Sequence, residues 1–111
     1  MKEIILNNIL NANAVTLSGR SEGTEARKYF KLDLKDNDNE HYKIIIPKRI
    51  RTFNISYFLG MFSLSVVKLK EEKFREKYIF KSENNEDVAI GVKLDIDEGI
   101  EWALEETSIL E

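Results

Sequence analysis

The chain contains no cysteine, one proline and one histidine among its 111 residues. Without cysteine there can be no disulfide, no thiolate chemistry and no cysteine-based zinc site. A single histidine excludes metal sites built on a histidine pair and weakens any case for acid–base catalysis. No apolar run approaches the roughly 20 residues of a membrane span, and Met1-Lys2-Glu3 does not begin a signal peptide. We therefore expect a cytoplasmic protein with no membrane partner, no metal and no cofactor.

The residues that are present describe one small globular domain over residues 1–111. Hydrophobic side chains make up 42% of the chain, which is a globular rather than a disordered composition. A chain of this length buries about two-thirds of its unfolded surface, enough for one modest core.

Charge is divided unevenly along the sequence. Residues 1–81 carry 16 basic and 10 acidic side chains, a net of +6, whereas residues 82–111 carry 1 basic and 10 acidic, a net of −9. One interpretation is an acidic amphipathic helix that closes the domain. The other is an acidic face that meets a basic partner or discourages contact with nucleic acid.

Apolar periodicity predicts an α/β fold, a mixed sheet of about four strands with helices packed against it. A buried strand is expected at residues 42–46, and the charged residues 36–40 before it read as a solvated loop. Residues 56–69 form an almost wholly apolar helix, with Phe58, Phe62 and Val66 on its buried stripe. The remaining expected elements are early strands at 3–6 and 14–17, a helix at 21–35, a turn at 70–77, a strand at 77–80 and an acidic helix from 97. Residues 88–96 fit a strand and a helix equally well.

The most informative segment joins the strand at 44–46 to the helix at 56–69. Ser56 stands where a helix N-cap belongs, so its hydroxyl is expected to accept from a backbone N–H. The free N–H groups and the helix dipole at such a position also suit a phosphate. Ser56 therefore has two interpretations, a helix cap and a phosphorylation site.

This segment resembles the STAS-like domains of unknown function and, more distantly, the STAS anti-sigma-factor antagonists. The resemblance covers roughly residues 15–105, in pattern more than in identity. Ser56 falls at the phosphorylated position of the antagonists, while Ile55 and Phe58 stand where they carry Asp and Gly. The residues that carry the resemblance are the strand Ile44-Ile45-Ile46, the turn Asn54-Ile55-Ser56-Tyr57-Phe58-Leu59-Gly60, Ser18-Gly19-Arg20 with Gly23, Ala26-Arg27, and the Asn84-to-Leu104 region.

The resemblance implies a non-enzymatic regulatory module that binds a protein partner, a histidine-kinase-fold ATP-binding protein, and is switched at Ser56. The expected contact centres on the basic loop and on the start of the following helix. Its residues are Lys48, Arg49, Arg51, Asn54, Ser56 and Tyr57.

Two other functions stay open. One is a structural protein that self-assembles through the apolar helix or a free sheet edge. The other is weak nucleic-acid binding through Lys48, Arg49 and Arg51, although the sequence pI near 5.3 makes nucleic acid an improbable partner. No nucleophile, base and orienting acid assemble in the sequence, so no catalytic residue is predicted.

Overall fold

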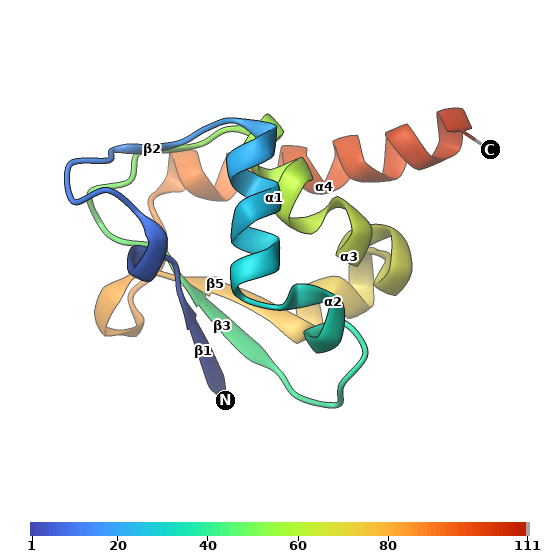
Figure 1. The fold of residues 1–111 in the computed structure, drawn as a ribbon, viewed down its shortest axis with the longest axis horizontal. Coiled ribbons are helices and arrows are strands. Elements are labelled where there is room, and N and C mark those ends of the chain that lie inside the picture. Colours follow the sequence, from blue (N-terminus) through green and yellow to red (C-terminus); the bar gives the residue numbers. More distant parts are fainter. Residues whose placement is uncertain (111) are drawn as a thin grey trace.

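The computed structural model describes residues 1–110, with side chains through Glu106 (Figure 1). Strands and helices alternate along most of this length, as expected for an α/β protein. The elements in chain order are β1 (Lys2–Ile5), the 3₁₀ helix η1 (Leu6–Ile9), β2 (Thr16–Leu17), α1 (Arg20–Tyr29), α2 (Leu32–Lys35), β3 (Tyr42–Ile45), β4 (Thr52–Phe53), α3 (Ile55–Lys77), β5 (Tyr78–Lys81), the 3₁₀ helix η2 (Glu83–Asn85) and α4 (Ile90–Leu110).

The strands form two parallel sheets, one of three strands in the order β1-β3-β5 and one pairing β2 with β4. The α/β class is confirmed, but the single mixed sheet of about four strands is wrong. Helices lie between the strands that pair, α1 and α2 between β1 and β3 and between β2 and β4, and α3 between β3 and β5, and such crossovers make paired strands parallel. Strands β2 and β4 have only two residues each and form a separate sheet.

The three-stranded sheet buries one face only. Ile4, Tyr42, Ile44 and Tyr78 are buried, while the residues that alternate with them remain partly or fully exposed. The strand expected at 42–46 is therefore buried on one face and not on both, as its continuous apolar run had suggested. An unbroken apolar run such as Ile44 to Ile46 is typical of a strand buried twice, but here Ile45 lies on the open side.

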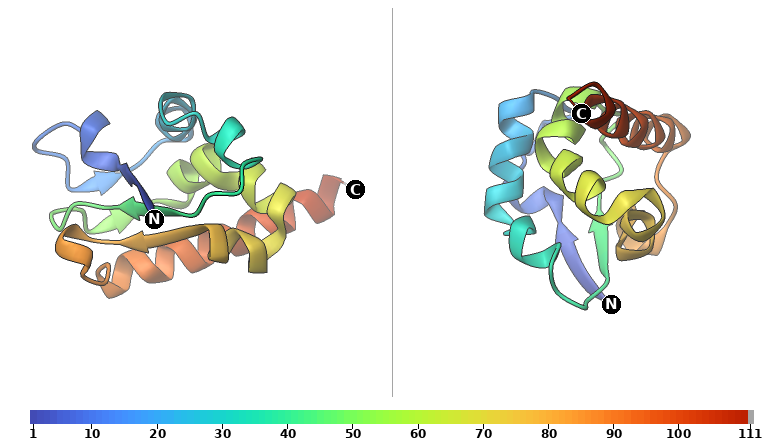
Figure 2. Two further views of the ribbon diagram at one scale, coloured as in Figure 1. Left: turned by 90° about the horizontal axis from the view of Figure 1, so that it is seen from below. Right: turned by 90° about the vertical axis from the view of Figure 1, so that its right-hand side faces the viewer.

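Helix α3 lies between α1 and α4 and is the centre of the core (Figure 2). Phe58, Phe62 and Val66 are fully buried, as the apolar stripe predicts. The Phe62 ring contacts four other aromatic rings at centroid distances of 5.4–5.5 Å, those of Phe58, Phe74, Tyr78 and Phe80.

Three helix boundaries differ from the sequence-based expectation. The helix expected over 21–35 is interrupted where Lys31 adopts a left-handed conformation with φ of 55°, which separates α1 from α2. Helix α3 does not end in a turn at 70 but continues to Lys77 across a break at Lys70 (φ 69°). Helix α4 begins at Ile90, because Val92, Ile96 and Ile100 together cover one helical face and are all buried.

Helices α1 and α3 approach until their backbones touch, at Gly23 on one helix and Gly60 on the other. Gly23 lies within α1, where the lack of a side chain permits this close approach. Over the described residues, no helix is both long enough and apolar enough to cross a membrane.

Candidate protein-interaction site

The short sheet of β2 and β4 places the beginnings of α1 and α3 side by side. The Arg51 N–H donates to the Val15 carbonyl and the Asn54 N–H to the Leu17 carbonyl, each at 2.8 Å. Two parallel strands that end together must start their following helices together. The partial positive charges of two helix N-termini therefore meet at one edge of the molecule.

Asn54, and not Ser56, is the N-cap of α3. The Asn54 side-chain oxygen accepts from the Ser56 N–H at 2.9 Å, and Asn54 has the extended backbone of a capping residue (φ −59°, ψ 142°). Both residue types cap helices well, and the sequence alone does not separate two good caps two positions apart. The N-cap prediction for Ser56 is therefore wrong.

The Ser56 hydroxyl instead joins the two helix starts. It donates to the Asn54 side-chain oxygen at 2.7 Å and accepts from the Gly19 N–H at 3.3 Å. Gly19 is the residue before α1 and has φ of 91°, a left-handed conformation that suits glycine. Ser56 is half-buried, so a charge introduced at its side chain would interact with the starts of both helices.

The basic loop does not form a single cationic surface. Lys48 forms an exposed ion pair with Glu86 at 2.6 Å. The Arg49 guanidinium folds back to donate to the Ala14 carbonyl, the Asn11 carbonyl and the Asn7 side chain at 2.8–2.9 Å. Arg51 is exposed. Of the predicted contact residues, the structure brings Asn54, Ser56 and Tyr57 together at the start of α3, while the side chains of Lys48 and Arg49 are bonded to other parts of the chain.

Tyr57 lies beneath this edge rather than on it. It is 3% exposed, and its ring packs edge-on against Phe53 at 5.7 Å. Burial, reinforced by the nearby Glu22 carboxylate, raises the pKa of Tyr57 to about 12. Tyr57 also lines a cavity of about 440 Å³ between η1, β2 and α1.

Helix α4 contributes residues that the sequence did not single out. Asp95 accepts from the Phe53 N–H at 2.9 Å, and Glu106 pairs with Arg20 at 3.3 Å. Trp102 is seven residues after Asp95 and four before Glu106, so it shares their helical face. It is 50% exposed. Exposed tryptophans are enriched at the energetic centres of protein interfaces.

A buried charged network holds α1, α3 and the loop after α2 together, and it too was missed from the sequence. Arg27 and Asp36 are only 7% and 5% exposed and pair at 2.6 Å. Arg27 also donates to Asp33, to the Met61 carbonyl and to the Ser65 hydroxyl, all at 2.9 Å. Asp36 in turn accepts from the hydroxyls of Ser65 and Tyr78. The expectation of a solvated loop at 36–40 is therefore wrong at Asp36.

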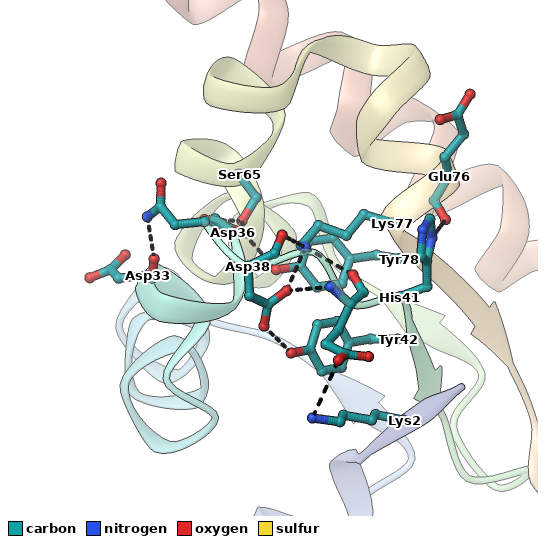
Figure 3. Close-up of polar contacts among 12 residues, drawn as sticks. Lys2, Asp33, Asp36, Asp38, His41, Tyr42, Ser65, Glu76, Lys77 and Tyr78 are labelled. Carbon is teal, nitrogen blue, oxygen red and sulfur yellow. Dashed lines mark hydrogen bonds and ion pairs between the residues drawn. The ribbon is translucent and has the colours of Figure 1, made fainter.

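The network continues outward through Asp38 (Figure 3). Lys77 donates to both the carboxylate and the carbonyl of Asp38 at 2.8 Å, and the Tyr42 hydroxyl donates to the same carboxylate. Burial tends to raise the pKa of Asp38, but the bonds from Lys77 and Tyr42 outweigh it and lower that pKa to about 2. His41 is exposed, and its ring Nδ1 lies 2.9 Å from the Glu76 carbonyl oxygen.

The Ser56 hydroxyl is paired with an amide oxygen, which is too weak a base to take its proton. Among the side chains that the structure describes, no three acidic or histidine residues come together as metal ligands. What the edge offers is a half-buried hydroxyl between two positive helix ends, with a half-exposed tryptophan on the adjacent helix.

In comparisons with known proteins, no family model, no curated protein and no solved structure matches the chain.

Proposed function

We propose that this chain is a non-enzymatic regulatory module of the STAS-like kind, which binds a protein partner at the paired starts of α1 and α3. The observation that carries the proposal is the position of the Ser56 hydroxyl, bonded to Gly19 on one side and to Asn54 on the other. The partner implied by the resemblance is an ATP-binding protein of the histidine-kinase fold.

Charge at Ser56 would act as the switch in this proposal. A phosphate carries about −1.5 to −2 charge at neutral pH. Esterification removes the hydroxyl proton, so the bond that Ser56 donates to the Asn54 oxygen is lost. The two helix N-termini and Arg20 would attract the phosphate, while the Glu22 carboxylate beside Gly19 would repel it. The edge would therefore be remodelled without unfolding, which is the behaviour required of a regulated contact.

One form of self-assembly and the nucleic-acid alternative lose support from the same structure. Self-assembly through the apolar helix would need the Phe58, Phe62 and Val66 stripe, which is fully buried within the chain. Self-assembly through a free sheet edge stays open. Nucleic-acid binding through the basic loop would need three free cations, but Lys48 is ion-paired and Arg49 is bonded to backbone carbonyls.

The test is a binding measurement with a purified partner, identified by cross-linking in the native cell. We expect Ser56→Asp to weaken partner binding at least tenfold and Ser56→Ala to change it less than threefold. Asn39→Asp adds the same charge in the exposed loop between α2 and β3 and should leave binding unchanged. Equal affinities for the serine, alanine and aspartate forms would refute a switch at position 56. A chain that cross-links only to itself would favour self-assembly.

A further inference from the structure

Tyr57 is a buried residue, 3% exposed, whose hydroxyl has no hydrogen-bond partner in the described part of the chain. Every fully inaccessible side-chain nitrogen or oxygen among the described residues has a hydrogen-bond partner, and Tyr57 has none. Its oxygen must therefore reach open space, and the space that Tyr57 lines is the 440 Å³ cavity. An unpartnered hydroxyl in an otherwise buried side chain is costly unless something polar meets it.

The cavity has a definite charge. Glu22 and Glu25 both line it from α1, and none of the described lining residues is basic. Glu22 forms no ion pair within the described chain, and Glu25 has only an exposed contact with Lys28 at 3.8 Å. An anion would be repelled here, whereas a cation that can donate hydrogen bonds would satisfy both carboxylates and the Tyr57 oxygen.

One border of the cavity is an open strand edge. The carbonyls of Val15 and Leu17 accept bonds from the β4 side, so the backbone groups of the alternating residues Thr16 and Ser18 point the other way. Thr16 and Ser18 both line the cavity. In the left view of Figure 2, the blue strand β2 lies between η1 on one side and the green strand β4 on the other. An extended peptide could therefore continue the sheet at β2.

The remaining lining suits the stem and head of a long basic side chain. Ile9 and Leu10 are partly exposed and supply apolar surface, which the methylene groups of lysine or arginine would cover. Tyr29 is 58% exposed and presents an aromatic ring beside the acids. Such a ring attracts an ammonium or guanidinium group.

We infer that this cavity binds an extended segment of the partner protein, whose backbone pairs with Thr16 and Ser18 and whose lysine or arginine side chain enters between Glu22, Glu25 and Tyr57. The inference rests on the proposed function, since it specifies the chemistry of the partner at the same edge of the molecule. Tyr57 connects the two, because it follows Ser56 directly in α3.

The probe is a fluorescein-labelled peptide of sequence Val-Thr-Val-Lys-Val-Thr-Val, and its control replaces the lysine with norleucine. Fluorescence anisotropy with the full chain should show the lysine peptide binding at least tenfold more tightly. The preference should fall on raising NaCl from 20 to 300 mM. The double variant Glu22→Gln, Glu25→Gln should remove it. The matched variant Glu98→Gln, Glu101→Gln removes two exposed charges from α4 and should have no effect.

Two further variants test the geometry. Tyr57→Phe removes only the unpartnered hydroxyl, so the fold should be retained while lysine-peptide affinity falls at least threefold. Thr16→Pro removes a backbone N–H that the chain does not use and should weaken the peptide at least fivefold. The thermal melting curve of each variant verifies that it is folded.

Several outcomes would overturn the inference. Equal binding of the lysine and norleucine peptides would show that the Glu22 and Glu25 carboxylates do not select a basic side chain. An unchanged affinity in the double variant Glu22→Gln, Glu25→Gln would show the same. Binding of n-butylammonium as tightly as the peptide would show a small-amine site without strand pairing. If peptide binding fails while partner binding still depends on charge at Ser56, this site is wrong and the proposed function stands. If the peptide preference holds but no partner is found, the proposed function fails alone.

Discussion

Gly23 and Gly60 fit reciprocally into each other's helices. A Cβ on Gly23 would lie 2.1 Å from the Tyr57 carbonyl oxygen, and a Cβ on Gly60 would lie 2.1 Å from the Arg20 carbonyl oxygen. No real Cβ contact is that short, and the obstacle in each case is backbone, which cannot swing aside. The separation of α1 and α3 is therefore set by the absence of these two side chains.

Gly23→Ala and Gly60→Ala should each destabilise the fold by about 3 kcal/mol, because the helices must separate to admit the methyl group. Gly91→Ala is the matched control, since a Cβ there meets only the Arg51 carbonyl oxygen at an ordinary 3.7 Å. That change should be neutral or should stabilise by about 0.5–1 kcal/mol through helix propensity. Urea titrations of the three variants give the comparison. Similar stabilities for all three would contradict the close approach.

The capping penalty should appear at Asn54. Asn54→Ala removes the acceptor for the Ser56 N–H and should cost about 0.5–2 kcal/mol. Asn54→Asp retains the acceptor and should recover most of that loss. Ser56→Ala loses one bond on each side of the hydroxyl and should cost about 1 kcal/mol. Guanidinium titrations give the free energy of unfolding of all three variants. If Asn54→Ala were as stable as the wild type, Asn54 would not be the N-cap of α3.

Removing Arg27 should be among the most damaging single changes. Arg27→Leu leaves the Asp36 carboxylate buried without its counterion, which costs about 3–5 kcal/mol. Adding Asp36→Leu removes the stranded charge, so the double variant should lose at least about 1 kcal/mol less than the two single losses combined. Additive losses in this double-mutant cycle would mean that the two side chains are not coupled in solution.

The fold should lose stability in acid through Asp38. Its pKa is held at about 2, below the usual value of 3.8, so the folded state binds the proton less readily than the unfolded state. The stabilising contribution is therefore complete above about pH 4 and is lost as the pH falls toward 2. Asp38→Asn should flatten the decline in unfolding free energy over that range. Glu72→Gln, at an exposed position on α3, should leave the slope unchanged.

Part of this arrangement could be predicted from the sequence because the signals were local. The apolar stripe of Phe58, Phe62 and Val66 repeats at the helical period, and burial follows directly from it. The choice at residues 88–96 could not be made locally. Val88, Val92 and Ile96 satisfy both the strand and the helix period, and only packing of Val92 and Ile96 against the core decides for a helix.

The buried charges escaped prediction for a different reason. Asp36 lies in a run of polar residues that looks solvated, and its burial depends on partners nine, 29 and 42 residues away in Arg27, Ser65 and Tyr78. No short-range sequence pattern predicts contacts between residues so far apart in the chain. The cavity at Tyr57 is similar, since its walls come from η1, β2, α1 and α3.

The contact between Gly23 and Gly60 limits sliding as well as separation, because the residues beside each glycine carry side chains that would clash with backbone if α1 moved along α3. Arg27 restrains the same motion at a second point, since its guanidinium bonds the Met61 carbonyl and the Ser65 hydroxyl on α3 and pairs with Asp36. Loss of Arg27 would therefore loosen the axial register of α1 against α3, and the bond between Ser56 and Gly19 would be disturbed before the domain unfolded.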